Sequence, residues 1–220
     1  MKKFLIATLL CMALTVTMVP MAFAADSNYT ECMAAIQEQR TIQDQAHQTA
    51  ESLRKKGYSD SSAYVQAAKS TWNEAQKAIA GYQKLAQYSD EDIRILTTTV
   101  FHEAGHTTEQ LRQYVAQGVL NRVEDSRFPD TVKGVITQPG QYSTKYATVE
   151  AANAIQATDS KNGTYYYGIC EDSVKAAMMG QVEMPSNVLY QANFSQGKGV
   201  WKSVYFNSGW YASTSYFCYG

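Results

Sequence analysis

The sequence lacks the surplus of positive charge that nucleic-acid-binding proteins carry. Among its 220 residues, 19 lysines and arginines stand against 20 aspartates and glutamates, for a net charge of −1. No basic block could follow a phosphate backbone, so we expect no nucleic-acid partner. Charged residues make up only 18% of the chain and aromatic residues 12%, which excludes a disordered composition.

Long hydrophobic runs are absent after the first 24 residues. Those residues begin with Lys2 and Lys3, continue through an apolar stretch at 4–19, and close on Ala22-Phe23-Ala24. A basic start, an apolar middle and an A-x-A ending are typical of a signal peptide. We therefore predict that residues 1–24 are removed and that the mature protein is secreted, with no stable membrane insertion after cleavage.

Cysteine is scarce, and no C-x-x-C pair is present. The predicted mature chain keeps Cys32, Cys170 and Cys218. Without a C-x-x-C pair, a thiolate zinc site is not expected. Export permits disulfides, and Cys170 and Cys218 are the better pair because they lie in the same half of the chain.

Proline is missing from residues 27–88, where Ala, Gln, Glu and Lys are frequent. This composition predicts a helical hairpin arm over 25–88, with helices at about 29–56 and 60–87. Gly57 would end the first helix, and Ser59 or Asp60 would cap the second. Apolar residues recur every three or four positions and form one narrow seam, so we expect a spacer or an arm that could dock a protein partner.

A second region, residues 89–220, is predicted to be the catalytic domain. Ser89 would cap a helix that runs to about Ala104 and stops at Gly105. Thr107 would then cap a helix at about 108–124. A further helix at about 171–179 and strands at 187–193 and 214–219 are expected.

The run His102-Glu103-Ala104-Gly105-His106 matches the H-E-x-x-H motif. In a zinc metallopeptidase, two such histidines bind zinc from one helix and the glutamate is the general base. Two features oppose this hypothesis. Gly105 would end the helix before His106, and no third ligand has motif support, although His47 in the arm and Glu124 are available.

Glu103 could instead act as a general acid by itself. A carboxyl group at a helix end can protonate a glycosidic oxygen when an apolar wall raises its pKa. Val100 and Phe101 could supply part of such a wall. By residue type alone, however, an ordinary surface acid is the more common role of such a glutamate.

The segments around Glu103 resemble the SleB-like cell wall hydrolases, which include the spore cortex-lytic enzymes. The resemblance covers roughly residues 91–220. It is carried by Phe101-His102-Glu103-Ala104-Gly105, Val119-Leu120-Asn121-Arg122-Val123, Ser126-Arg127-Phe128-Pro129-Asp130-Thr131-Val132, Gly134-Val135-Ile136 and Gln138-Pro139-Gly140-Gln141-Tyr142-Ser143. It continues more weakly through Val188-Leu189-Tyr190-Gln191-Ala192-Asn193, Trp201 and Phe217-Cys218. The chain departs from the family at His102 and His106, and at Thr107, where a second acid or amide is common.

The resemblance implies a peptidoglycan lytic transglycosylase at the cell wall. Its fold would be α+β: a lysozyme-like catalytic domain, mainly helical with a small β region, which follows the N-terminal helical hairpin in the sequence. Glu103 would be the catalytic acid, with no cofactor. Gln141, Tyr142 and Ser143, in the most recognisable loop, and Tyr190, in a family-like segment, would bind the glycan strand.

A lytic transglycosylase can work with one carboxylate, whereas an ordinary glycosidase needs two. Glu103 would protonate the oxygen between N-acetylmuramic acid and N-acetylglucosamine, then take a proton from the muramic C6 hydroxyl. Asn121 and Arg122 are expected to brace the helix end. A zinc metallopeptidase that uses His102 and His106, and a catalytically silent wall-binding protein, remain the alternatives.

Overall fold

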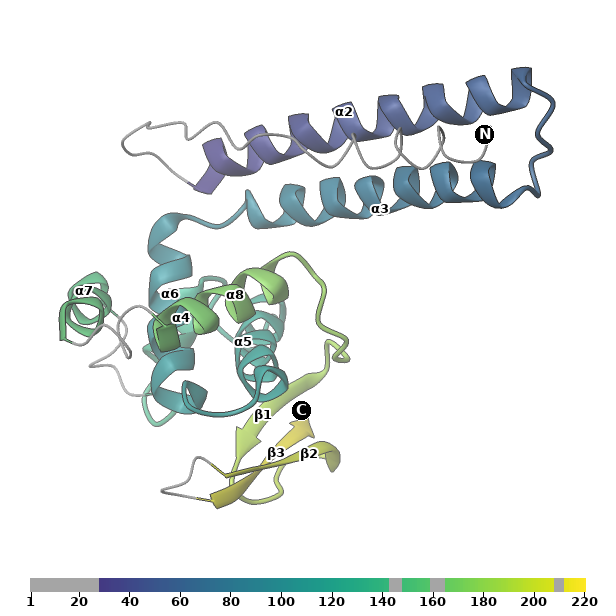
Figure 1. Cartoon of the computed structure of the whole chain (residues 1–220). Helices are drawn as coiled ribbons and strands as arrows, with labels where there is room; N and C mark the ends of the chain where they lie inside the picture. Colours follow the sequence, from purple (N-terminus) through teal and green to yellow (C-terminus); the bar gives the residue numbers. More distant parts are fainter. Residues whose placement is uncertain (1–27, 143–147, 159–164, 208–211) are drawn as a thin grey trace.

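The computed structural model describes residues 28–142, 148–158, 165–207 and 212–220 (Figure 1). The predicted signal peptide, residues 1–24, lies outside these residues. Within them, no helix combines the length and apolar character needed to cross a membrane.

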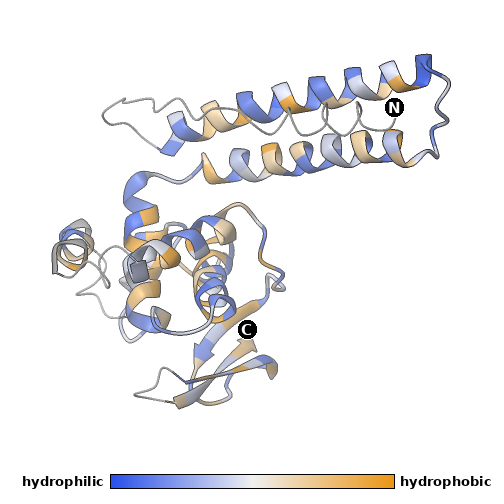
Figure 2. Ribbon diagram, viewed as in Figure 1, coloured by the Kyte–Doolittle hydropathy of each residue, from blue (hydrophilic) through white to orange (hydrophobic). Residues whose placement is uncertain are grey.

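The chain begins with a long antiparallel hairpin of α2 (Asn28–Lys55) and α3 (Ala63–Leu85). The turn after α2 uses Gly57 at a positive φ of 86°, as predicted. Ser62, and not Ser59 or Asp60, caps α3 by accepting a hydrogen bond from the Val65 amide. Figure 2 shows apolar residues recurring at intervals among hydrophilic ones along both helices, which fits the narrow seam expected from the sequence.

The near end of the hairpin is joined to the rest of the protein through Asn28. Its side-chain amide donates hydrogen bonds to the carbonyl oxygens of Leu85 (2.7 Å) and Tyr88 (2.9 Å). Its backbone N–H donates to the Asp90 carboxylate at 2.8 Å. Cys32 and Leu85 belong to the main hydrophobic core, so this end of the arm is part of the core.

Five further helices follow: α4 (Asp90–Ala104), α5 (Glu109–Glu124), α6 (Val132–Ile136), α7 (Val149–Thr158) and α8 (Tyr167–Met178). Helices α4, α6 and α8 pack against α5, and α7 packs against α4. Ser89 caps α4 as predicted. The cap of α5 is Thr108, so the predicted Thr107 cap is wrong. The Thr107 hydroxyl donates instead to the Ala104 carbonyl at 2.6 Å, which closes the last turn of α4.

A small antiparallel sheet completes the domain, with strands β1 (Val188–Ala192), β2 (Val200–Asn207) and β3 (Ala212–Tyr219) in the order β1-β3-β2. The sequence predicted β1 and β3 but missed β2. Phe217 of β3 is buried against α5, where its ring lies 5.4 Å from that of Tyr114. The α+β fold class, mainly helical with a small β region behind a helical hairpin, is confirmed.

The expected disulfide between Cys170 and Cys218 is absent. Both residues, like Cys32, are buried free thiols. Cys170 lies in α8 and Cys218 in β3, and their shared half of the sequence does not fix the geometry that a disulfide requires. Burial raises the pKa of the Cys170 thiol to about 12, which keeps it in the unreactive thiol form.

We predict that these three thiols resist alkylation in the folded protein and react once it is unfolded. The measurement is thiol titration of residues 28–220 in native buffer and in denaturant, both without reductant. Three reactive thiols are expected in denaturant. A single reactive thiol there would show that a disulfide forms after all.

Candidate active site

Glu103 is held in the last turn of α4. The helix ends at Ala104, and the Gly105 N–H donates to the Phe101 carbonyl. A side chain at position 105 would clash with that same carbonyl oxygen, so this tight ending requires glycine. Val100 and Ala104 face the core, which leaves the Glu103 side chain on the exposed side of the helix end.

Glu103 borders a pocket of about 190 Å³ between α4, α5, the segment after α6 and the sheet. The pocket is mostly polar, with a few apolar groups. Its lining residues are Glu103, Arg122, Gln141, Tyr142, Gln191, Ala192, Asn193, Phe206, Ser213 and Ser215. Segments more than 100 residues apart therefore meet at this one carboxyl group.

The surroundings of Glu103 favour its protonated form. Although the side chain is exposed, nearby protein atoms remove enough water to raise its pKa above the ordinary value for a glutamate. Desolvation also raises the pKa of Tyr142, which Arg122 lowers and Glu103 raises further, so the phenol lies within the electrostatic reach of both groups. A carboxyl group in this state can donate a proton at a pH where most glutamates are ionised.

Arg122 fixes the wall opposite Glu103. It is 4% exposed, and its Nε donates to the Leu189 carbonyl at 2.5 Å. Its Nη1 donates to Oε1 of Gln141 at 2.7 Å. The guanidinium carbon lies 5.4, 5.6 and 5.8 Å from the ring centroids of Phe128, Tyr142 and Tyr190. These contacts join α5 to β1 and to the segment after α6.

The structure brings three of the predicted site residues together. Glu103, Gln141 and Tyr142 line one pocket. Tyr190 does not line it, because its ring lies against Arg122; its neighbours Gln191, Ala192 and Asn193 line the pocket instead. Ser143 lies outside the described residues.

The helix-end residues Asn121 and Arg122 both brace the fold. The Asn121 amide donates to the carbonyl oxygens of Pro185 and Val188, both at 2.9 Å. Arg122 has a second role that the sequence did not suggest, because it also borders the pocket. The apolar wall that Val100 was expected to supply beside Glu103 is made by other residues. Val100 is fully buried in the core, and Ala192 and Phe206 supply the apolar contacts at the pocket.

Sequence reasoning missed the pocket residues of the sheet, namely Asn193, Phe206, Ser213 and Ser215. Phe206 lies in β2, the strand that was not predicted. The alternation of Val204 and Phe206 with polar or exposed neighbours was the available signal. Nothing in the sequence alone marked Ser213 and Ser215, which reach the pocket because β3 pairs with β2.

The two histidines lie beside Glu103 but are held by aromatic contacts. The His106 ring is 4.3 Å from Tyr166 and 5.8 Å from Phe101, and the His102 ring is 5.5 Å from Phe101. Glu124, the conceivable third ligand, acts electrostatically on Tyr88 near the opposite end of α4. Among the described residues, no group of three or more His, Cys, Asp or Glu side chains could hold a metal.

Comparison with known proteins covers the second half of the chain. A protein-family model described as Cell Wall Hydrolase matches residues 107–213, beginning four residues after Glu103. A spore cortex-lytic enzyme of Halalkalibacterium halodurans is 36% identical over 93 residues, which is 37% of this chain and 28% of that protein. One from Oceanobacillus iheyensis is 38% identical over 56 residues, 26% of this chain and 20% of that protein.

The chain therefore spans less than a third of the length of these curated relatives. No solved structure matches it. The matched residues supply most of the pocket wall, from Arg122 to Ser213. The resemblance read from the sequence motifs is confirmed: residues 107–213 match the cell wall hydrolase family of the SleB type, and part of the chain is similar to two spore cortex-lytic enzymes.

Proposed function

We propose that the protein cleaves the glycan strands of peptidoglycan as a lytic transglycosylase, with Glu103 as the single acid and base. One observation carries the proposal: Glu103 is the only carboxylate among the described residues that line the pocket, and its pKa is raised. A two-carboxylate glycosidase would need a second one at about 5–9.5 Å. The substrate class is supported by the cell wall hydrolase domain and by the two spore cortex-lytic relatives.

The proposed reaction needs no water and no cofactor. The protonated Glu103 gives its proton to O4 of N-acetylglucosamine as the bond from that oxygen to C1 of N-acetylmuramic acid breaks. The Glu103 carboxylate then takes the proton of the muramic C6 hydroxyl, and O6 bonds to C1. The products are a free 4-hydroxyl and a 1,6-anhydro end, and Glu103 is again protonated.

The rest of the pocket supplies polar groups that can hold a sugar ring by hydrogen bonds. The positive charge that develops at muramic C1 would be stabilised by oxygen atoms of such groups, without a second carboxylate. Because Arg122 holds Oε1 of Gln141, that side chain is fixed, and its amide nitrogen can donate to the sugar. Asn193, Ser213 and Ser215 add further polar groups to the same pocket.

The first prediction is that Glu103→Gln abolishes glycan cleavage. The amide keeps the shape but has no proton to give, so the rate should fall at least about a hundredfold. Glu109→Gln, six residues away at the start of α5, is the matched control and should cleave normally. Mass spectrometry of digested peptidoglycan should find 1,6-anhydromuramic ends. Reducing muramic ends in their place would mean that water attacks, and the transglycosylase mechanism would be rejected.

The pH profile provides a second test. Desolvation raises the pKa of Glu103, and the protonated carboxyl is the active form. Activity should therefore persist above the pH at which an ordinary glutamate ionises, and should fall as pH rises through the raised pKa. The control is circular dichroism over the same range. A rate that increases with pH through this range, while the fold is unchanged, would contradict a catalytic acid.

The zinc metallopeptidase alternative makes a different prediction. If zinc carried the chemistry, His102 and His106 would be ligands, and a chelator would remove both metal and activity. We expect dialysis against a chelator to leave glycan cleavage intact and His102→Ala to keep most of its activity. Metal analysis of the purified protein accompanies both assays. Activity that follows zinc content, or cleavage of peptides and not of glycans, would favour the peptidase.

We also propose that residues 1–24 direct export and that the mature protein acts outside the cytoplasm at the cell wall, without stable membrane insertion. In this proposal residues 25–88 are an arm attached to the catalytic domain, 89–220, through its near end, where Cys32 and Leu85 enter the core. Figure 1 shows the far part of α2 and α3 extending beyond the other helices. Tyr64 and Trp72 are exposed on α3, as suits an arm that docks a protein partner.

A further inference from the structure

A group of aromatic rings lies next to Glu103, outside the pocket. It consists of His106, Tyr165 and Tyr166, here called the aromatic surface. The His106 and Tyr166 ring centroids are 4.3 Å apart, and those of Tyr165 and Tyr166 are 5.2 Å apart. His106 and Tyr165 are exposed, Tyr165 to 59%, and Tyr166 is half-buried. Large rings left accessible beside a catalytic carboxyl group are available to a ligand.

The position of the aromatic surface is fixed by the backbone. His106 follows Glu103 by three residues, in the turn directly after the end of α4, so it is held close to the helix end that carries Glu103. Tyr165 and Tyr166 form a π-helical turn that leads into α8, and such turns are frequent at functional sites. Phe101 supports the group from below, with its ring 5.8 Å from His106 and 6.2 Å from Tyr167.

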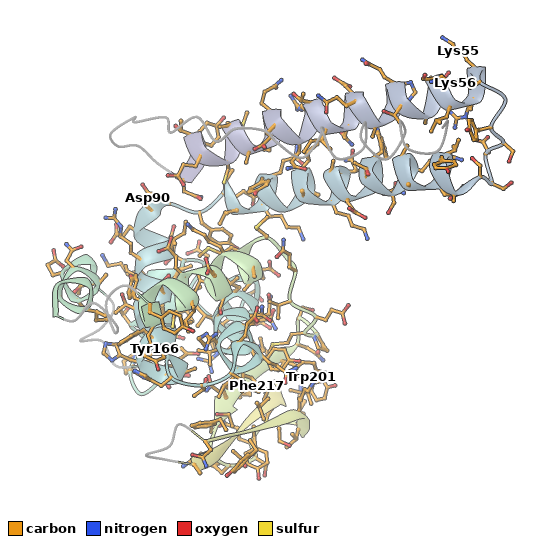
Figure 3. The ribbon with its side chains drawn as sticks, viewed as in Figure 1. Lys55, Lys56, Asp90, Tyr166, Trp201 and Phe217 are labelled. Atoms are coloured by element: carbon orange, nitrogen blue, oxygen red, sulfur yellow. The ribbon has the colours of Figure 1, made fainter. Side chains whose placement is uncertain are left out.

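The pocket and the aromatic surface both adjoin the end of α4 that carries Glu103. In Figure 3, Tyr166 lies beside the C-terminal end of α4, whereas Trp201 and Phe217 mark the sheet on the other side. The pocket faces the sheet, because Phe206, Ser213 and Ser215 line it. Its volume of about 190 Å³ is below the ~300–1,000 Å³ of common ligand pockets, so it has room for about one sugar ring.

A glycosidic bond joins two rings, and the acid that breaks it must stand at the oxygen between them. If one ring fills the pocket, the other lies across Glu103 from it. We propose that the aromatic surface binds the leaving N-acetylglucosamine ring, a proposal that rests on the proposed function. The polar groups of the pocket suit the muramic ring, where charge develops, and the flat aromatic rings suit the apolar face of the uncharged leaving sugar.

Substitution of Tyr166 tests this assignment by kinetics. With a peptide-free glycan tetrasaccharide as substrate, Tyr166→Ala should raise KM about tenfold while kcat changes less, since a stacking contact is lost. Tyr166→Phe keeps the ring and should restore KM. Tyr205→Ala is the matched control, because Tyr205 is 65% exposed on β2 and lies outside both the pocket and the aromatic surface. Thermal unfolding verifies that each variant is folded.

A binding experiment separates this proposal from the proposed function. Ligand-observed NMR would follow methyl N-acetyl-β-glucosaminide with the full-length Glu103→Gln protein, which needs no activity. Binding is expected there and should be lost in Glu103→Gln/Tyr166→Ala but kept in Glu103→Gln/Tyr205→Ala. Binding that survives the Tyr166 change, or no binding at all, overturns the assignment. A wild-type protein that binds the sugar through Tyr166 but produces no anhydro ends would refute the proposed function alone.

Discussion

The buried guanidinium of Arg122 is the constraint on which the pocket depends. A charge removed from water must find polar partners, or the folded state loses stability. In the described ranges no carboxylate pairs with Arg122. Its partners are the Leu189 carbonyl, the Gln141 side chain and three aromatic rings. These partners come from three separate parts of the chain, so satisfying this one cation sets the relative positions of α5, β1 and the segment that carries Gln141.

The same arrangement explains why Glu103 can remain an acid although an arginine borders its pocket. A direct ion pair would favour the carboxylate and lower its pKa. Arg122 instead donates from Nη1 to Gln141, and desolvation raises the pKa of Glu103. The amide of Gln141 thus takes the contact that would otherwise ionise the acid. Arg122 therefore holds the pocket residues in place without stabilising the ionised form of Glu103, and the proposed reaction requires the protonated form.

Much of this could be predicted from local sequence signals. Ser89, Gly57 and Gly105 mark helix ends because capping and termination depend on nearby backbone groups. The prediction that Thr107 caps α5 was wrong because Thr107 and Thr108 are adjacent and either could act as the cap. The path of the backbone decides that Thr108 caps α5, whereas Thr107 bonds the end of α4. Glu103, Gln141 and Tyr142 were found through motifs, while Ser213 and Ser215 were not, because their place in the pocket depends on pairing with β2. Tyr190 lies next to the pocket residues in sequence, but its ring lies against Arg122.

The strand order has a consequence for when the protein can act. β3 follows β1 and β2 in the sequence but is the middle strand of the sheet, so β1 and β2 have no partner in the sheet until β3 is in place. Ser213 and Ser215 arrive with it, and Phe217 anchors the sheet against Tyr114. A growing chain that already contains Glu103 and Arg122 therefore still lacks one wall of its pocket. The pocket cannot be complete before synthesis has passed β3, so a nascent chain that already contains Glu103 has no finished site until then.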